Sequence, residues 1–334
     1  MNKLVRGWLA AVLLLLAGCA SPVAGMAAPD PEVLREIERE RQRNEPLSAQ
    51  DALGDFTTVD YCSLLDVEAL APPMRIDGDP LPSFEYCDLP VTMDGSTVTV
   101  SVGMLRERET GTGQVVDPDK ELPRQLTMER MPGAGECYLY IVFPDDYQLQ
   151  VHATTYAAGA EPGDIPEEQL CLLSETVLDL VVESLAEEKP VRHFSFADNS
   201  FGSVDACGDG APMLDGGQLA AVLGEGEAQQ IPVPSGHYCR WELGEAYASV
   251  AMYVGVPPQE GAGTVRESIA GREAFVYESG GEMCVIELPH QPFAGASNGE
   301  VEFAGIFVRG VTRKPPCEAA RAMAGAVWPK LPAS

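Results

Sequence analysis

The sequence predicts an α+β protein built from two tandem domains, and three observations support this prediction. A set of four cysteines occurs twice, strand-like segments fill the middle of each unit, and helix-like segments stand near the start and at the end of each unit. Helices at both ends of an antiparallel sheet pack on one of its faces. Each unit is therefore expected to be an antiparallel sheet with one face covered by helices.

The repeat is visible in eight of the nine cysteines. The corresponding members stand between 145 residues (Cys62 to Cys207) and 152 residues (Cys87 to Cys239) apart, and Val59-Asp60 before the first set returns as Val204-Asp205 before the second. A period of this length is typical of a whole domain rather than of a small array repeat. We therefore predict a first domain at 56–188, a linker at 189–200 and a second domain at 201–334.

Apolar spacing predicts the elements of each domain. In the first domain we expect a short amphipathic helix at 62–70, strands at 85–89, 97–104, 125–130, 137–143 and 147–156, and a closing helix between Pro166 and Glu188. In the second domain we expect a helix at 218–224, strands at 238–243, 247–254, 273–278, 284–288 and 301–309, and a closing helix at 317–328.

The N-terminal segment has the pattern of a secretion signal. Lys3 and Arg6 precede an apolar run from Leu9 to Leu16, which is shorter than the about 20 residues that span a bilayer. The run ends in Leu16-Ala17-Gly18-Cys19, which resembles the lipobox of bacterial lipoproteins. The resemblance implies removal of residues 1–18, lipidation of Cys19, and attachment to the extracytoplasmic face of the cell membrane.

Residues 19–55 are predicted to be a tether between the lipid and the first domain. Asp30-Pro31 offers a helix N-cap and a first-turn proline, and the segment 32–43 is highly charged with few apolar residues. A helix that is polar on all sides is typical of a solvated spacer.

The tandem domains resemble an actinobacterial family of secreted lipoprotein domains of unknown function. Asp60-Tyr61-Cys62-Ser63-Leu64-Leu65 is similar to the opening of that family, and Cys239-Arg240-Trp241 is similar to its second cysteine with a tryptophan two residues later. The second domain lacks the two leucines and the first lacks the tryptophan. The resemblance implies an envelope location and an α+β fold, and it brings no catalytic residues.

The eight cysteines after Cys19 are predicted to form disulfides, because they are exported, even in number and too far apart for a zinc site. Four cysteines per domain allow three pairings. The expected strand order places the first cysteine beside the second and the third beside the fourth. We therefore predict the pairs Cys62 with Cys87, Cys137 with Cys171, Cys207 with Cys239, and Cys284 with Cys317.

Charge and motif patterns narrow the function classes. The formal net charge of −29 repels phosphate backbones, so nucleic acid is not an expected partner. The histidines (His152, His193, His237 and His290) form no spaced pair, and Asp77-Gly78-Asp79 and Asp117-Pro118-Asp119 lack the spacing of a calcium loop. Gly295-Ala296-Ser297-Asn298-Gly299 matches a nucleophile pattern but is expected to be a hairpin loop. No catalytic residue, metal site or cofactor is predicted.

Two main function hypotheses remain. The first is a non-enzymatic envelope lipoprotein that binds a protein, glycan or lipid partner, and the second is a sensor or solute-binding lipoprotein that captures a small ligand. An exported hydrolase is a third possibility. Because tryptophan is enriched at binding surfaces, Trp241 and Trp328 in the second domain suggest that this domain carries the binding residues.

Overall fold

The computed structural model describes residues 30–70, 75–93, 95–108, 114–115, 122–133, 136–155, 165–208, 212–261, 263–279, 282–294, 299–310 and 314–333. The chain divides into two compact units, Met1–Arg43 and Asn44–Ser334. Both repeats, 56–188 and 201–334, lie in the second unit. The lipidation residue Cys19 lies outside the described residues.

Helix α2 (Pro31–Asn44) forms where the sequence predicts a helix in the tether. The Asp30 carboxylate accepts a hydrogen bond from the N–H of Glu32 at 2.8 Å, which caps the first turn. Val33 and Leu34 are exposed. These contacts agree with the expected solvated helix.

The compact unit begins earlier than the predicted domain start at Phe56. Leu47, Ala49 and Leu53 are buried in the core of the first repeat, and the last two belong to helix α3 (Ala49–Leu53). The N–H of Ala49 donates to both carboxylate oxygens of Asp145 at 3.0 Å. The segment 44–55 is therefore part of the folded unit rather than of the tether, because contacts distant in sequence bury its few apolar side chains.

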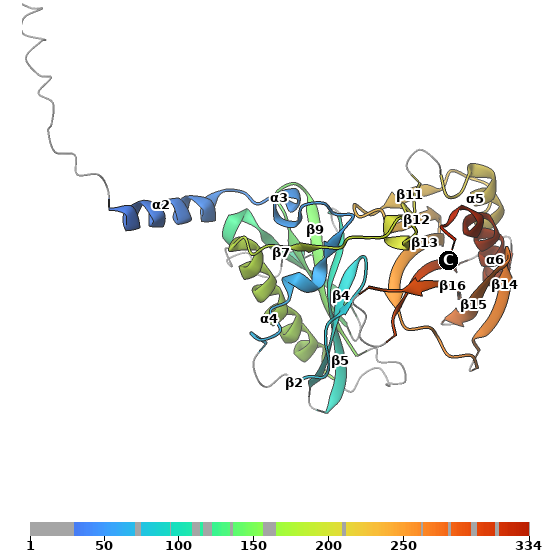
Figure 1. The fold of residues 1–334 in the computed structure, drawn as a ribbon, viewed down its shortest axis with the longest axis horizontal. Helices are drawn as coiled ribbons and strands as arrows, with labels where there is room; N and C mark the ends of the chain where they lie inside the picture. The colour runs from blue at the N-terminus through green and yellow to red at the C-terminus, as the bar shows by residue number, and fades with distance from the viewer. Residues whose placement is uncertain are drawn as a thin grey trace, which may run out of the picture. The chain divides into compact units, whose positions relative to one another are not determined.

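The first repeat contains an antiparallel sheet with helix α4 (Glu167–Ala186) on one face (Figure 1). Its strands, in spatial order, are β2 (Arg75–Ile76), β4 (Tyr86–Met93), β5 (Ser96–Glu107), β9 (Tyr147–Thr154), β8 (Glu136–Val142), β7 (Thr127–Gly133) and β6 (Gln114–Val115), with β3 (Leu81–Pro82) also paired to β4. Alternate side chains of the central strands point toward α4 and form one core.

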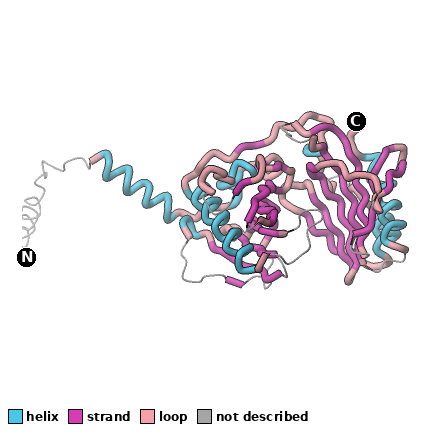
Figure 2. The backbone as a smooth tube through the Cα atoms, turned by 90° about the horizontal axis from the view of Figure 1, so that it is seen from below, coloured by secondary structure: helices cyan, strands magenta, loops and turns pink. Residues whose placement is uncertain are grey.

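The second repeat has the same connectivity. Its strands, in spatial order, are β11 (Gln229–Pro232), β12 (Tyr238–Leu243), β13 (Ala246–Gly255), β17 (Val301–Arg309), β16 (Met283–Pro292), β15 (Arg272–Ser279) and β14 (Val265–Ile269). Helices α5 (Gly216–Leu223) and α6 (Pro316–Val327) lie together beside this sheet (Figure 2). The order β4-β5-β9-β8-β7-β6 corresponds to β12-β13-β17-β16-β15-β14, which confirms that the two units share one fold.

The first helix of each repeat differs from its prediction. In the first repeat the expected helix at 62–70 is only a 3-10 turn, η2 (Tyr61–Leu64). In the second repeat α5 starts at Gly216, with a capping box between Asp215 and Gln218, and stops at Gly224.

The Asp-x-Cys motif that the two repeats share has a local cause. Asp60 accepts from the N–H of Cys62 at 3.1 Å and Asp205 accepts from the N–H of Cys207 at 2.9 Å, so each aspartate holds the turn that presents the cysteine.

All four predicted disulfides are present. Cys62 pairs with Cys87, Cys137 with Cys171, Cys207 with Cys239, and Cys284 with Cys317. Each bridge joins a helix or turn to a strand of the same repeat. The disulfides therefore link the helical layer covalently to the sheet within each repeat.

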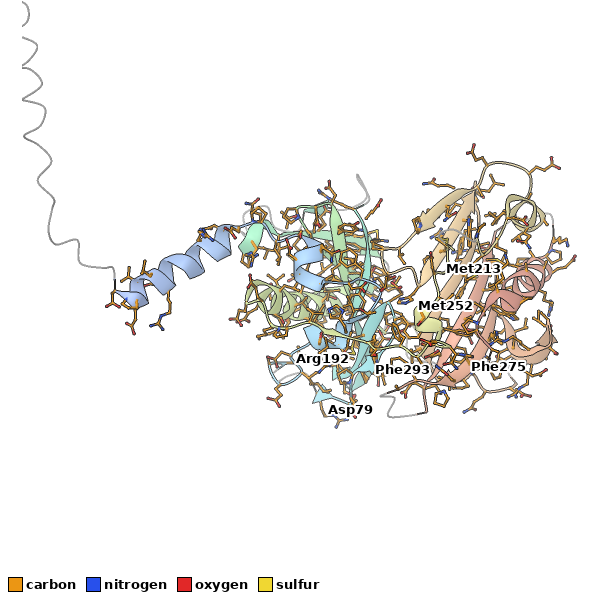
Figure 3. All side chains as sticks on the ribbon, turned by 45° about the horizontal axis from the view of Figure 1, so that its top comes forward. Asp79, Arg192, Met213, Met252, Phe275 and Phe293 are labelled. Carbon is orange, nitrogen blue, oxygen red and sulfur yellow. A yellow bond between two sulfur atoms is a disulfide. The ribbon has the colours of Figure 1, made fainter. Side chains whose placement is uncertain are left out.

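The two tryptophans do not support the hypothesis that the second repeat carries the binding residues, because both are buried. Trp241 and Trp328 are 2% and 1% exposed and belong to the core of the second repeat, together with Met213 and Met252 (Figure 3). Large aromatic side chains supply much of the apolar area of a small core. These two residues stabilise the fold and contribute no surface for binding.

The linker is held against the first repeat by strand pairing and an ion pair. Strand β10 (Arg192–His193) pairs with β1 (Val59–Asp60), and the guanidinium of Arg192 donates to the Asp60 carboxylate at 3.0 Å. The linker therefore enters the second repeat from a defined position.

Candidate functional site at the junction of the repeats

A segment of the first repeat completes the core of the second. Phe84, just before β4, is 1% exposed and belongs to the second repeat's core rather than to its own. Its ring centroid lies 5.1 to 5.8 Å from the rings of Phe196, His237 and Phe293. We call Phe84 and these three rings the junction cluster. Apolar contacts of this kind hold the two repeats together.

Corresponding residues of the two repeats meet beside this cluster. Ser83, Glu85 and the following Tyr-Cys pair match Ser235, His237 and their Tyr-Cys pair in the second repeat. Nδ1 of His237 lies 3.3 Å from Oε1 of Glu85, and both side chains are buried. The hydroxyl of Ser235 donates to the same Glu85 carboxylate, and the hydroxyl of Ser83 accepts from the N–H of Val254 at 3.1 Å.

The tautomer of His237 follows from its neighbours. Nε2 lies 2.9 Å from the backbone oxygen of Gly202, and a carbonyl oxygen can only accept, so Nε2 carries a hydrogen. The other ring nitrogen, Nδ1, is the one that faces the Glu85 carboxylate. A buried pair of this kind adds little net stability, because desolvation offsets most of the attraction, but removal of one partner leaves the other buried and unpaired.

Tyr61 adds a third polar group near this pair. Its side chain is buried, and within the described part of the chain its hydroxyl has no hydrogen-bond partner. Burial raises the pKa of Tyr61 well above its usual range, and the negative charge of Glu85 raises it further. The phenol therefore stays neutral at physiological pH.

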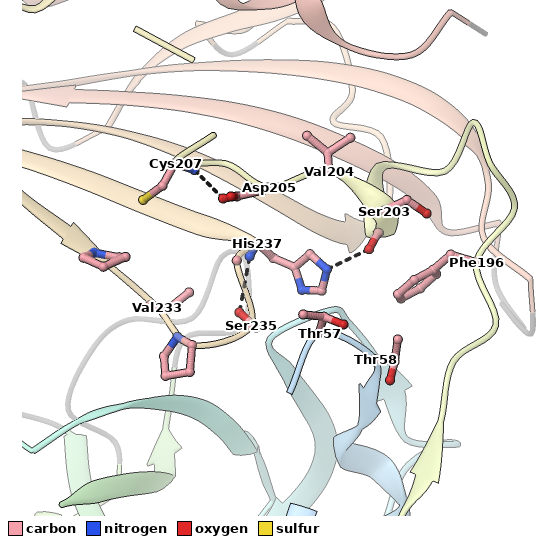
Figure 4. Close-up of a pocket in the computed structure, with 14 residues that line it drawn as sticks. Thr57, Thr58, Phe196, Ser203, Val204, Asp205, Cys207, Val233, Ser235 and His237 are labelled. Atoms are coloured by element: carbon pink, nitrogen blue, oxygen red, sulfur yellow. Dashed lines mark hydrogen bonds between the residues drawn. The ribbon is translucent and has the colours of Figure 1, made fainter. Parts of the chain in front are cut away.

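A pocket opens beside the junction cluster (Figure 4). Its volume is about 420 Å³, and segments from both repeats and from the linker line it. We call it the junction pocket. The lining residues are Thr57, Thr58, Phe196, Gly202, Ser203, Val204, Asp205, Cys207, Pro232, Val233, Pro234, Ser235, Gly236 and His237.

Two glycines and two prolines shape the pocket wall. Gly236 has a φ of +78° and closes a turn in which its backbone N–H donates to the backbone oxygen of Val233 at 3.0 Å. A Cβ on Gly202 would stand 2.5 Å from the ring of Phe196, so only glycine allows that ring to pack there. Pro232 and Pro234 flank Val233 and restrict the backbone of the loop between β11 and β12.

Glu85 and the junction pocket were not predicted from the sequence, and His237 was named only as one of four histidines that form no spaced pair. Their only signal in the sequence was the match of Glu85-Tyr86-Cys87 to His237-Tyr238-Cys239, in which an acidic and a basic residue occupy corresponding positions. His152 stacks on Tyr138 at 4.6 Å and His290 stacks on Phe201 at 4.1 Å, so neither histidine joins the junction.

Among the residues that the structure describes, the remaining motifs bring no further site together. Residues 295–298 of the Gly-x-Ser-x-Gly match lie outside the described residues, although the flanking strands β16 and β17 pair as an antiparallel hairpin. Asp117-Pro118-Asp119 also lies outside them. Asp77 accepts from Arg75 at 3.0 Å and from Thr92. Within the described ranges, no three His, Cys, Asp or Glu side chains are grouped to hold a metal, and no helix is long and apolar enough to cross a membrane.

Comparisons with known proteins give no family. No protein-family model matches the chain, and no curated protein sequence matches it. A crystal structure of MucB in complex with MucA(peri) aligns with 74% of this chain and 88% of that chain, at 11% sequence identity and a TM-score of 0.15. A TM-score this low carries no argument about fold or function.

Proposed function

We propose that this protein is a non-enzymatic binding lipoprotein, anchored through Cys19 on the extracytoplasmic face of the cell membrane. The observation that carries the binding role is the junction pocket, since ligand sites occur preferentially where domains meet and have volumes of about 300–1,000 Å³. Four disulfides support an oxidising compartment outside the cytoplasm. The lipobox-like sequence supports the membrane anchor.

The junction pocket favours capture of a small ligand, or of one side chain of a larger envelope partner, over a flat contact with a protein, glycan or lipid surface. The contacts of its side chains give little support to the hypothesis that the protein is a hydrolase. Ser235 is only 2% exposed, which keeps its hydroxyl away from a substrate, and Nε2 of His237 donates to a backbone oxygen, so this nitrogen is not placed to act as a base for a nucleophile.

Cys19→Ala tests the anchor. We expect the wild-type protein in the membrane fraction with the mass of a lipidated chain beginning at Cys19, and the variant outside that fraction without the lipid mass. Ser21→Ala, two residues away, serves as the matched control and should behave as wild type. A Cys19→Ala protein that keeps both its membrane fractionation and its mature mass would contradict the proposed anchor.

Ser203→Trp tests the binding site by filling the junction pocket from an exposed position. The control is Ser279→Trp, because Ser279 is exposed on β15 and does not line the pocket. Native mass spectrometry of protein extracted gently from its own membranes should detect a bound molecule on the wild type and on Ser279→Trp, and none on Ser203→Trp. The same bound molecule on all three proteins would exclude the junction pocket.

A further inference from the structure

A second pocket, separate from the junction pocket, is lined by both repeats and by the linker. Its volume is about 510 Å³, within the range of about 300–1,000 Å³ that is typical of ligand sites. We call it the linker pocket. The lining residues are Asp60, Cys62, Ser63, Leu65, Val67, Pro80, Pro82, Arg192, Phe194, Phe293 and Ala294, and none of them lines the junction pocket. Two of them, Arg192 and Phe293, are labelled in Figure 3.

Most lining residues of the linker pocket are apolar. The rings of Phe194 and Phe293 lie 5.4 Å apart and meet edge to face at 80°. Phe293 is 6% exposed and also packs on Phe84 of the junction cluster, so the core holds this aromatic wall in place. Seven of the eleven lining residues have apolar side chains: Leu65, Val67, Pro80, Pro82, Phe194, Phe293 and Ala294.

The polar side chains from the first repeat are already engaged. The Ser63 hydroxyl donates to the backbone oxygen of Asp60 at 2.7 Å and accepts from the backbone N–H of Arg192 at 3.0 Å. The Asp60 carboxylate accepts from the backbone N–H of Cys62 at 3.1 Å and from Nε of Arg192 at 3.0 Å. The sulfur of Cys62 is bonded to Cys87. The positive charge of Arg192 therefore balances the carboxylate, and the hydroxyl proton of Ser63 is used within the protein.

The guanidinium of Arg192 keeps donors for a ligand. Among the described residues only its Nε has a hydrogen-bond partner, so Nη1 and Nη2 retain the other N–H donors of the group. The Arg192 side chain is 68% exposed, so water solvates these donors when no ligand is present. The ion pair with Asp60 and the pairing of β10 with β1 hold the guanidinium beside the pocket. An acceptor oxygen on a ligand can take the place of that water.

We propose that the linker pocket binds an apolar group that carries an acceptor oxygen. The apolar group contacts the wall formed by Phe194 and Phe293, and the oxygen accepts from the Nη groups of Arg192. A neutral carbonyl group and a carboxylate both have this chemistry. A cationic ligand brings donors and a charge that the guanidinium repels. The linker pocket is a second site, so this inference goes beyond the proposed function of the junction pocket.

Isothermal titration calorimetry and protein NMR with three probes that share one apolar group test this inference. 4-Phenylbutyramide carries a neutral carbonyl oxygen, 4-phenylbutyrate carries a carboxylate, and 4-phenylbutylamine carries a cation. We expect at least one oxygen-bearing probe to bind and to shift the NMR signals of Phe194 and Phe293, which the amine should not shift. Because the formal charge of −29 attracts the amine to the surface in general, the NMR signals decide where each probe binds. Binding of the amide alone assigns an uncharged ligand, and binding of the carboxylate assigns an acidic one.

Arg192→Met is the decisive variant, and Arg266→Met is its matched control. Both arginines are exposed and pair through Nε with a carboxylate, but only Arg192 lines the pocket. Methionine keeps an unbranched apolar chain and removes the donors and the charge in both variants. We expect Arg192→Met to weaken binding of the oxygen-bearing probe about fivefold, because the lost hydrogen bonds come from a charged but exposed group. Arg266→Met should leave the affinity unchanged.

Three outcomes would overturn the inference. Both oxygen-bearing probes could fail to shift the pocket signals at millimolar concentration, the amine could bind in the pocket as tightly as they do, or the two arginine variants could weaken binding equally. None of these outcomes removes the proposed binding function, because that function is decided separately by the molecule bound to the wild type and absent from Ser203→Trp.

Discussion

Phe84→Ala should weaken the attachment between the two repeats more than it weakens the repeat to which Phe84 belongs. The phenylalanine side chain is fully buried and its neighbours are the rings of the junction cluster, within 5.8 Å. Truncation of a buried phenylalanine to alanine costs about 3–5 kcal/mol, from lost apolar burial and from the cavity that remains. Because these contacts lie in the core of the second repeat, the lost free energy should destabilise that core and the junction between the repeats.

The two tryptophans after Cys19 make this prediction measurable. Trp241 and Trp328 both lie in the core of the second repeat, so their fluorescence reports its unfolding, whereas far-ultraviolet circular dichroism reports both repeats. In urea we expect the two signals of the wild-type protein to change together. For Phe84→Ala the fluorescence midpoint should move to lower urea and precede the dichroism midpoint, because the second repeat unfolds first.

Phe143→Ala is the matched control, since Phe143 is equally buried but lies in the core of the first repeat. It should lower stability by a similar amount without an early fluorescence change. A Phe84→Ala cost below about 1 kcal/mol, the size of an ordinary substitution, would refute the reasoning. Fluorescence and dichroism transitions that coincide in both variants would also refute the reasoning.

Three further predictions concern the junction and the two layers of the first repeat. Glu85→Gln and His237→Gln should each destabilise the protein, and a double-mutant cycle in urea should give a coupling energy of about 1–3 kcal/mol, whereas additive losses would show that the pair is not coupled. Burial raises the pKa of Asp88 to about 6, above the unfolded value, so this carboxyl stabilises the fold below pH 4 and that contribution is lost as the pH rises toward 6. Asp88→Asn should therefore increase the free energy of unfolding at pH 7 by about 1–2 kcal/mol and leave it nearly unchanged at pH 4, and equal changes at both pH values would contradict the assignment. Replacing Cys137 and Cys171 together by serine should cost about 2–4 kcal/mol under oxidising conditions and almost nothing relative to the wild type under full reduction, as measured by thermal unfolding in both conditions.

The sequence alone determined the central strands, the closing helix and the covalent links of each repeat. Strand β12 has the predicted bounds because its alternating side chains reflect a local backbone preference, and β17 has them because it is a nearly continuous apolar run. Helix α5 stops before the predicted Gly224, because glycine readily adopts the positive φ found there. The disulfide pairing was also predictable. Each pair joins neighbouring elements of one repeat, so the strand order was sufficient to place the cysteines together.

The tertiary structure alone decided how the two repeats are joined and where the pocket lies. Phe84 is an ordinary apolar residue in the sequence, and nothing near it indicates that it packs into the core of the other repeat. Glu85 and His237 are 152 residues apart and become a pair only when the two repeats meet. The same holds for Leu47 and Leu53, whose burial ends the tether earlier than expected. Local spacing records the preference of a segment for helix or strand, whereas the contact between two finished surfaces depends on side chains from many segments at once, and a single sequence does not show which of them will meet.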